Sequence, residues 1–391
     1  MATRNIRIIM EGVTGRLGTN QHLVRSLMAI AKEGGLPLRD GSCLMPVPVL
    51  LGRNPDKLAA LAAANGGLEW STDREACLAD PTNEIYFDVA STGGRFDRAM
   101  SAIRAGKHIY LEKPIGASLD EAVRLARAAE AAGLKNGVVQ DKLFLPGLQK
   151  LGKLKKSGYF GRILSVKLDF GWWVFDGSLY PAQRSSWNYK KAEGGGLILD
   201  MFPHWRYILD KLIGEVRSVS CISTTQLPRR VDEQNNSYPV DVEDHVVAIA
   251  QLEGGVIAQI FSSWTTRVRL DDMLTIHVDG TEGSAVAGLH DCMLQPAVAT
   301  PKPVWSVDNP AIHAEGLREA WQPMPDVDPF LHSYRAGWQH FLRHVVEDAP
   351  FPSPLIDGAK GLQLVEACHR SHSERRWIDL EPLDASAGNA A

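Results

Sequence analysis

The sequence predicts an α/β fold in which a doubly wound parallel sheet is followed by an α+β part with a large, mostly antiparallel open sheet. Short apolar runs alternate with helical periodicity in the first part of the chain, and longer alternating strands with hairpin-like breaks follow them. We therefore place two domains at residues 1–145 and 146–391. The C-terminal helices are free, in this prediction, to pack back on the first domain.

The first domain repeats a strand, a turn and a helix. An apolar run, IRIIM (residues 6–10), leads through a glycine-rich turn into a stretch with helical periodicity. The same pattern follows VPVLLGR (residues 47–53) and IYFDVAST (residues 85–92), and HIYLEKP (residues 108–114) precedes an alanine-rich helix. Alternation of this kind is typical of parallel βαβ units.

The second domain has longer strands with an alternating pattern. Breaks at EGG (residues 253–255) and DGTEG (residues 279–283) predict antiparallel hairpins. One strong helix interrupts these strands, in GGGLILDMFPHWRYILD (residues 194–210). Residues 333–348 and 359–374 are predicted to form two amphipathic helices near the end of the chain.

Composition narrows the classes of partner. The 391 residues are 45% hydrophobic and 23% charged, with a formal net charge of -4, which indicates an ordinary globular protein and no nucleic-acid partner. No apolar run approaches the ~20 residues that span a bilayer, so we expect a cytoplasmic protein that does not bind a membrane. The five cysteines are an odd number without CxxC spacing, which predicts free thiols and no metal site.

Three glycines lie in the first turn, between the first strand and its helix. Gly12, Gly15 and Gly18 have GxxGxxG spacing, which allows a tight turn whose N–H groups approach a pyrophosphate at the helix N-terminus. We therefore predict a dinucleotide site, with a tight turn that binds nothing as the alternative. After the second strand, Arg53 favours NADP through its 2′-phosphate, whereas an NAD enzyme would use Asn54 in place of the usual carboxylate.

Two motifs carry a family resemblance. AGKHIYLEKPIG (residues 105–116) resembles the AGKHVxxEKP signature of the Gfo/Idh/MocA oxidoreductases, and residues 194–210 resemble their GGGxLxDxGxHxxD signature. The resemblance implies an N-terminal Rossmann domain and a C-terminal α/β domain whose open sheet mediates homodimers or homotetramers. It also implies NAD or NADP as cofactor and a sugar, a polyol or a derivative as substrate.

The resemblance assigns the proton chemistry to Lys113 and His204. Hydride transfer from a carbinol carbon requires the hydroxyl proton to leave, so a base must contact that oxygen. Histidine titrates near ~6.5, and burial or a neighbouring charge can lower the ~10.4 of lysine. Asp200 shares a helix face with His204 and would orient it or bind a second hydroxyl; the alternative is a capping aspartate and a core histidine. Glu112 would support Lys113.

The aromatic-rich stretch DFGWWVFDGSLYPAQRSSWNYKKAEGGG (residues 169–196) is the predicted substrate wall. Aromatic faces pack on the C–H side of sugar rings. Core packing or a subunit interface is the alternative for each aromatic, and Arg184 could instead bind an acidic sugar. The predicted substrate contacts are Lys113, Trp172, Trp173, Arg184, Trp187, Asn188, Asp200 and His204. The predicted cofactor contacts are Gly12, Thr14, Gly15, Arg16, Leu17, Gly18, Arg53, Asn54, Ser91, Thr92, Glu112, Lys113 and Gln140.

The chain departs from the family pattern at three places, which indicates a divergent member. Phe202 and Pro203 follow the motif aspartate where glycine is common, and Pro203 is expected to kink the helix or begin it. ASTGGRF (residues 90–96) replaces a Pro-Asn-x-x-His arrangement, and Lys142 lies where arginine is frequent.

The predicted function is hydride transfer between NAD(P) and a secondary hydroxyl of a sugar, glycoside or polyol. One alternative is a redox-neutral glycosidase that keeps NAD tightly bound and works by oxidation, elimination and reduction. Another is a non-catalytic dinucleotide-binding sensor, although Lys113 and His204 speak against it.

Overall fold

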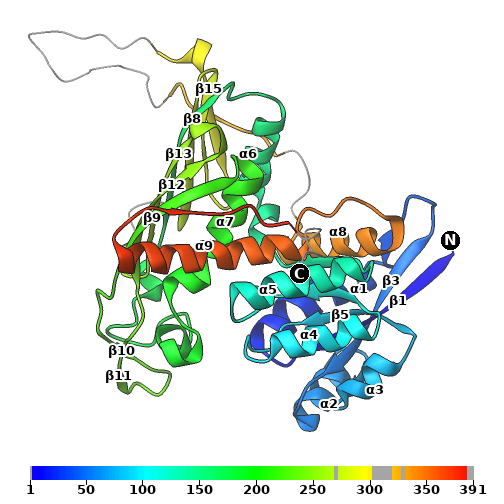
Figure 1. Cartoon of the computed structure of the whole chain (residues 1–391). Coiled ribbons are helices and arrows are strands. Elements are labelled where there is room, and N and C mark those ends of the chain that lie inside the picture. The colour runs from blue at the N-terminus through cyan, green and yellow to red at the C-terminus, as the bar shows by residue number, and fades with distance from the viewer. Residues whose placement is uncertain (1, 268–271, 302–318, 327–330, 385–391) are drawn as a thin grey trace, which may run out of the picture. The chain divides into compact units, whose positions relative to one another are not determined.

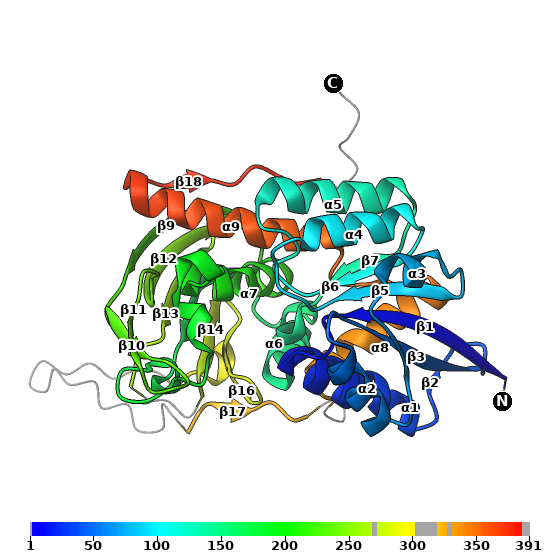
Figure 2. The ribbon, with the colours of Figure 1, turned by 90° about the horizontal axis from the view of Figure 1, so that it is seen from below.

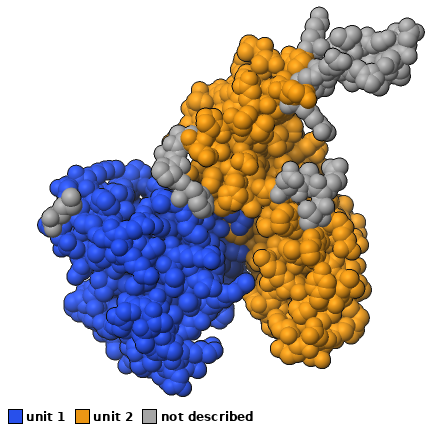
Figure 3. All heavy atoms as spheres, turned by 180° about the vertical axis from the view of Figure 1, so that it is seen from behind, with its two compact units in different colours: residues 1–144, 331–363, 382–391 blue, residues 145–330, 364–381 orange. Residues whose placement is uncertain are grey.

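The computed structural model describes residues 2–267, 272–301, 319–326 and 331–384. Contacts divide the chain into two compact units, coloured separately in Figure 3. The first unit comprises residues 1–144, 331–363 and 382–391, and the second comprises residues 145–330 and 364–381. Among the described residues, no helix is both long and apolar enough to cross a membrane.

The first unit is built on a parallel sheet with the strand order of dinucleotide-binding folds. Its parallel strands run in the order β4-β3-β1-β5-β6-β7, and β2 adds to β3 in the antiparallel direction. The chain order reverses between β1 and β5, and ligands of such sheets bind at the carboxyl ends of the strands near this point. The strands are β1 (Thr3–Glu11), β2 (Leu36–Pro37), β3 (Cys43–Leu51), β4 (Glu69–Ser71), β5 (Asn83–Asp88), β6 (His108–Leu111) and β7 (Asn136–Val138).

Helices cover both faces of this sheet. Figure 2 shows α4 and α5 on one face and α1 with α8 on the other. Side-chain caps fix several helix starts: Asn54 caps α2, Asp73 caps α3 and Ser118 caps α5. The helices are η1 (Gly18–Leu27), α1 (Met28–Lys32), α2 (Pro55–Ala64), α3 (Arg74–Ala79), α4 (Arg95–Arg104), α5 (Leu119–Ala131) and α8 (Ser333–Glu347).

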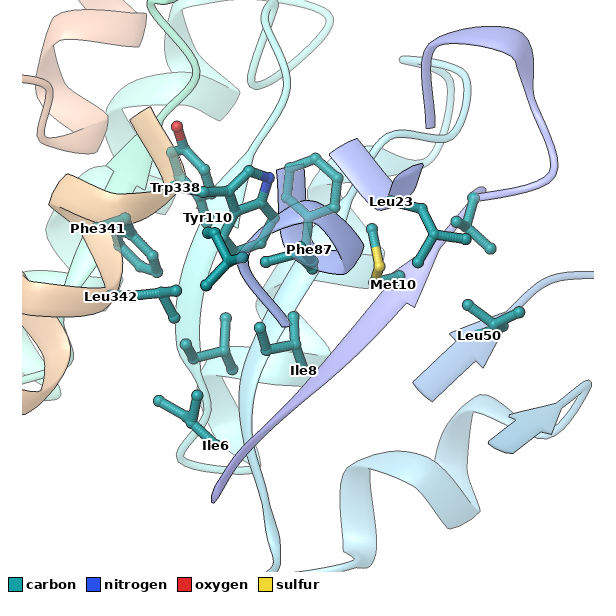
Figure 4. Packing of buried hydrophobic residues seen from close by; sticks show 14 of the residues in the cluster. Ile6, Ile8, Met10, Leu23, Leu50, Phe87, Tyr110, Trp338, Phe341 and Leu342 are labelled. Atoms are coloured by element: carbon teal, nitrogen blue, oxygen red, sulfur yellow. The ribbon is translucent and has the colours of Figure 1, made fainter. Parts of the chain in front are cut away.

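The core of the first unit includes a helix from near the end of the chain. Tyr110 of β6 stacks on Phe341 of α8 with ring centroids 4.5 Å apart, and Trp338 packs edge-on against Phe87 of β5 (Figure 4). These rings, together with Ile8 of β1, have almost no exposed surface. Burial of this apolar surface stabilises the unit and fixes α8 against the sheet.

The second unit is built on an open sheet. In the part of the chain that the structure describes, its strand order is β17-β16-β15-β14-β8-β13-β12-β9-β18, and β8 pairs with β13 in the parallel direction. The predicted hairpins are confirmed, because β12 and β13 join at residues 253–255 and β14 and β15 join at the DGTEG turn. The strands are β8 (Ile163–Phe170), β9 (Val216–Thr224), β12 (His245–Leu252), β13 (Ile257–Ser263), β14 (Leu274–Gly280), β15 (Gly283–Ala287), β16 (Cys292–Pro296), β17 (Gln322–Pro323) and β18 (Ile378–Asp379).

Two helices of this unit lie on one side of its sheet, α6 (Pro146–Lys156) and α7 (Leu197–Leu212), as Figure 1 shows. Val246, Ala248 and Ala250 of β12 are buried, while the alternate residues Val247 and Ile249 are exposed. The sheet therefore has one packed face and one open face. A small hairpin of β10 (Arg229–Val231) and β11 (Ser237–Pro239) lies outside it, and α9 (Leu355–Glu374) contributes residues to both units.

Candidate functional site

The turn of residues 12–18 in the first unit, which we call the dinucleotide turn after its predicted ligand, requires glycine at its first position. Gly12 has a φ of +80°, and its N–H donates to the carbonyl of Leu51 at 3.0 Å. A Cβ at this position would lie 2.4 Å from the backbone nitrogen of Ala90. Only glycine therefore lets the end of β1 pass so close to the segment after β5.

The other two glycines of this turn, Gly15 and Gly18, have different surroundings. A Cβ on Gly18 would lie 2.8 Å from the Cα of Val13 and 2.9 Å from Cγ1 of Val89, so glycine permits close packing where η1 begins. A Cβ on Gly15 would meet only the carbonyl oxygen of Gly12, at 3.5 Å. Gly15 is exposed and leaves the flank of the turn open, which fits the close approach of a pyrophosphate.

The remaining predicted residues of this turn lie beside that open flank. Arg16 and Leu17 are exposed and Thr14 is half-buried. The helix that follows, η1, is a π-helix over Gly18–Leu27, although the sequence indicated an ordinary helix at this place. π-Helical segments are rare and frequently occur at functional sites.

The segment after β3, which would meet the adenosine end of a dinucleotide, presents a cation. Arg53 is exposed and lies two residues beyond Leu51, the last residue of the strand. Asn54 is the N-cap of α2, because its Oδ1 accepts the N–H of Lys57 at 3.0 Å. No carboxylate follows the strand before the helix begins.

The segment ASTGGRF is held by an arginine that the sequence analysis did not select. Arg95 is buried, and its guanidinium donates to the carbonyl of Glu112 at 2.9 Å and to the carbonyls of Ala90 and Pro114. Arg95 thereby connects this segment to residues 112–114, the EKP segment. The two predicted cofactor residues within ASTGGRF differ in exposure: Ser91 is exposed and Thr92 is half-buried.

The EKP segment places Lys113 at the carboxyl end of β6. Lys113 is half-buried, and its peptide bond to Pro114 is cis. Glu112 is buried, and its Oε2 accepts the backbone N–H of Lys113 at 3.0 Å, so the predicted support of Lys113 by Glu112 has a geometric counterpart. The other oxygen of Glu112 contacts Nε2 of His22 at 2.9 Å, a contact that the sequence analysis missed.

Gln140 lies just after β7 at the same edge of the sheet. It is only 3% exposed, and its Oε1 has no hydrogen-bond partner among the described residues. A buried acceptor without a partner is costly unless a ligand donates to it. The amide of a nicotinamide ring carries such a donor, so Gln140, the open flank at Gly15 and the Arg53 cation all fit a nicotinamide dinucleotide.

In the second unit, three glycines bring the chain into α7. A Cβ on Gly195 would lie 2.4 Å from the carbonyl oxygen of Asn188, and Gly196, with a φ of +124°, donates to that oxygen at 2.9 Å. The backbone of Asn188 therefore anchors the start of α7, while its side chain donates to the carbonyl of Ser185 at 3.2 Å.

The expectation that Pro203 begins the helix is wrong. α7 begins at Leu197 and continues through Pro203, its seventh residue, to Leu212. Proline there removes one i−4 hydrogen bond, and the burial of the apolar neighbours Phe202 and Trp205 offsets that loss. The motif residues Asp200 and His204 consequently share one helix.

Each of the two polar motif residues of α7 has a side-chain partner. His204 is buried, and its Nδ1 lies 2.7 Å from the hydroxyl of Tyr207, three residues further along the helix. Asp200 forms an ion pair with Arg184 at 2.9 Å. Tyr207 was missed, although a hydroxyl at i+3 on the same face was a usable signal.

The predicted substrate wall separates into exposed and buried members. Trp173 and Trp187 are 36% and 46% exposed and can meet a ligand, whereas Trp172 is half-buried. Arg184 lies 5.9 Å from the ring centroid of Trp264, another residue that the sequence analysis missed. Nε1 of Trp172, Nε1 of Trp264 and Nε of Arg184 are buried donors without partners among the described residues. Such donors suit hydroxyl acceptors.

Comparisons with known proteins identify the family of both parts of the chain. Residues 7–139 match the model of an oxidoreductase family with an NAD-binding Rossmann fold, and residues 148–286 match the GFO/IDH/MocA C-terminal domain. The chain is 45% identical to the D-xylose dehydrogenase of Paenarthrobacter nicotinovorans over 385 residues, which cover 97% of this chain and 99% of the relative.

More distant relatives share the fold. The levoglucosan dehydrogenase of Pseudarthrobacter phenanthrenivorans is 24% identical over 362 residues, which cover 87% of this chain and 91% of the relative. A solved structure of levoglucosan dehydrogenase in complex with NADH and L-sorbose superposes with a TM-score of 0.79 at 22% identity, covering 98% of this chain and 100% of that one.

The predicted Rossmann and α+β architecture is confirmed, and so is the predicted oxidoreductase class. The chain belongs to the Gfo/Idh/MocA oxidoreductase family, and it is an NAD(P)-dependent oxidoreductase.

Proposed function

We propose that this oxidoreductase is a sugar dehydrogenase and that D-xylose is its substrate. The observation that carries the proposal is the 45% identity to a D-xylose dehydrogenase along almost the full length of both chains. The chain also has Lys113 and His204, the polar residues to which the two motifs assign the proton chemistry. A sensor that only binds dinucleotide would need neither.

The residues would act on the proton of one substrate hydroxyl. When bound, the nicotinamide accepts the hydride from the carbon that carries this hydroxyl, and the hydroxyl proton leaves to a base on the protein. We assign that base to His204, assisted by the ammonium group of Lys113, which polarises the oxygen. The tautomer that this role requires has Nδ1–H donating to Tyr207 and a lone pair on Nε2.

The charges in the second unit favour a neutral sugar. Arg184, which could have bound an acidic sugar, lies 2.9 Å from Asp200, so its charge is already balanced. The unpartnered N–H donors of this region suit hydroxyl oxygens. Trp173 and Trp187 offer exposed aromatic faces for the C–H side of the ring.

We further propose that the enzyme accepts NADP as well as NAD, with a preference for NADP. The support is the exposed cation of Arg53 after β3, together with the commitment of Asn54 to its helix cap. A carboxylate at this place would favour the ribose of NAD, and the segment has none.

The proposed enzyme is a cytoplasmic homodimer or homotetramer. Support for self-association comes from an apolar set on the open face of the sheet, where Ile222 of β9 pairs directly with Val247 of β12 and Ile249 lies nearby. Exposed apolar surface of this kind is typical of an interface. Light scattering after gel filtration tests it, and a monomer at micromolar concentration would contradict it.

A spectroscopic screen tests the proposed reaction. The purified full-length protein is mixed with NAD⁺ or NADP⁺ and with D-xylose, D-glucuronate or an aryl xyloside. We expect reduced nicotinamide to accumulate with D-xylose and not with D-glucuronate. Release of the aglycone without net reduction would instead support a redox-neutral glycosidase, and no reaction with any sugar would contradict the dehydrogenase.

A further inference from the structure

A buried chain of hydrogen bonds in the first unit ends at the backbone of Lys113. Nε1 of Trp338 donates to Nδ1 of His22 at 3.1 Å, and Nε2 of His22 lies 2.9 Å from Oε1 of Glu112. Oε2 of Glu112 accepts the backbone N–H of Lys113 at 3.0 Å. Trp338, His22 and Glu112 are 0%, 1% and 4% exposed, so the chain is shielded from water.

The direction of every bond in this chain follows from one donor. The indole nitrogen of Trp338 can only donate, so Nδ1 of His22 must accept and carries no proton. The proton of the neutral ring is therefore on Nε2 and is donated to Glu112. Glu112 accepts from His22 on one oxygen and from Lys113 on the other, which requires its carboxylate form.

Aromatic rings enclose the central histidine. His22 packs against Phe87 with ring centroids 4.5 Å apart and against Tyr334 at 5.0 Å. In such apolar surroundings hydrogen bonds are strong, and a buried polar group that loses its partner is costly. The histidine therefore has one favourable orientation and one favourable tautomer.

The sequence places His22 inside the π-helical winding of η1. His22 is the fifth residue of η1, which begins at Gly18 directly after the dinucleotide turn. The wider winding turns side chains in other directions than an α-helix would, and here it accompanies a histidine that faces β5 and Glu112.

We propose that Trp338, His22 and Glu112 are positioning residues that fix the backbone from which the Lys113 side chain extends. Arg95 holds the same segment from the other side through the carbonyls of Glu112 and Pro114. A flexible lysine stem reaches its substrate productively only if its own Cα is fixed. This inference rests on the proposed role of Lys113.

Three variants at His22 and Trp338 and one control at Tyr334 test the proposal by kinetics. His22→Leu and Trp338→Phe each remove bonds of the chain, and we expect kcat with D-xylose to fall roughly 10–100-fold while the Kd of NADH changes less than about 3-fold. His22→Gln can donate to Glu112 and accept from Trp338, so it should keep kcat within about 3-fold of the unmodified enzyme. Tyr334→Phe, a neighbour that retains the ring, is the control and should change neither.

A double-mutant comparison separates positioning from general damage. If His22 acts through Lys113, His22→Leu should cause less than about a 2-fold further loss of kcat in the Lys113→Ala background. A further loss as large as in the unmodified enzyme would overturn the inference. If Lys113→Ala itself leaves turnover unchanged, the proposed catalytic role of Lys113 is wrong. That result would not test the hydrogen bonds among Trp338, His22 and Glu112.

The tautomer can be measured without activity. We expect ¹⁵N NMR shifts of His22 to show a protonated Nε2 and an unprotonated Nδ1 in the cofactor-free protein. In Trp338→Phe this preference should weaken. A proton on Nδ1 of the unmodified protein would overturn the hydrogen-bond chain whatever the kinetic results.

Discussion

Lys113 and His204 are held in different ways. The backbone of Lys113 is fixed by Glu112, whereas the imidazole of His204 is fixed through its own ring by Tyr207. A lysine can move its ammonium group over several ångströms, while a histidine acts through two nitrogens whose roles depend on their partners. The partner of His204 should therefore influence catalysis directly.

Tyr207→Phe tests this influence. The variant keeps the buried ring and removes the hydroxyl 2.7 Å from Nδ1 of His204, so we expect kcat to fall roughly 10-fold and the Kd of NADH to stay within about 2-fold. Tyr180→Phe serves as the control because Tyr180 is exposed. Steady-state kinetics with D-xylose make the comparison, and equal kcat values for the two variants would rule out a role for Tyr207.

Arg53→Ala tests the cofactor preference. If the guanidinium binds a 2′-phosphate, kcat/KM for NADP⁺ should fall roughly 10–100-fold, as expected for a charge-assisted hydrogen bond, and kcat/KM for NAD⁺ should stay within about 2-fold. Lys57→Ala, which removes a nearby exposed cation from α2, controls for general charge effects. Equal losses with both cofactors would argue against phosphate recognition by Arg53.

At the scale of elements, local sequence signals predicted most strands and helices. The turns at Glu253–Gly255 and Gly280–Gly283 were readable because glycine marks reversals between alternating strands. The π-helical winding of η1 was not readable, because apolar periodicity over ten residues fits either winding.

The contacts that complete the first unit could not be predicted from local sequence patterns either. His22 and Trp338 are 316 residues apart and meet only through tertiary folding. Arg95 has the pattern of an ordinary helix-start arginine, yet it is buried and binds three carbonyls. Motifs predict residues within one segment, and they do not reveal partners that another segment supplies.

Gly12→Ala tests the dinucleotide turn as an element. Both Gly12 and Gly66 have positive φ, +80° and +86°, but a Cβ on Gly66 meets nothing within 4 Å. Gly66→Ala should therefore cost about 1 kcal/mol of unfolding free energy from φ alone. Gly12→Ala should cost roughly 1–3 kcal/mol more, because the Cβ overlaps Ala90, and it should raise the Kd of NADH at least about 10-fold.

Urea unfolding and fluorescence titration with NADH measure the two effects. Equal unfolding free energies for the two alanine variants would mean that the close approach of Gly12 and Ala90 does not occur. An unchanged Kd in Gly12→Ala would separate this turn from the cofactor.

At the scale of the whole molecule, the first unit draws residues from both parts of the chain. α8 supplies Trp338 and Phe341 to the core under β1, β5 and β6 (Figure 4). The parallel sheet therefore does not complete its core until α8 has been synthesised. This segment also supplies groups that respond to pH.

Stability of the first unit should decrease as the pH falls below about 7. Burial lowers the pKa of His108, His332 and His344. In the unfolded chain these residues titrate near ~6.5, so between that value and their lowered folded values the unfolded state binds more protons. Their contribution is present above ~6.5 and is lost as the pH falls toward the folded pKa values.

Urea unfolding at pH 7.5, 6.5 and 5.5 measures this loss. In the folded protein Nδ1 of His108 accepts the N–H of Lys135 at 3.2 Å, so protonation there would break a bond. His108→Asn can keep an acceptor without titrating, and it should reduce the pH dependence. Stability that rises on acidification over this range would contradict the assignment.

The central claim is that Lys113 and His204 serve one proton transfer, and the kcat of Lys113→Ala, His204→Ala and the double variant with D-xylose tests it most directly. Each single substitution should lower kcat roughly 10²–10⁴-fold, and the double variant should lie within about 10-fold of the worse single one, because groups that act as a unit are not additive. Single variants with normal kcat, or losses that multiply in the double variant, would contradict the account.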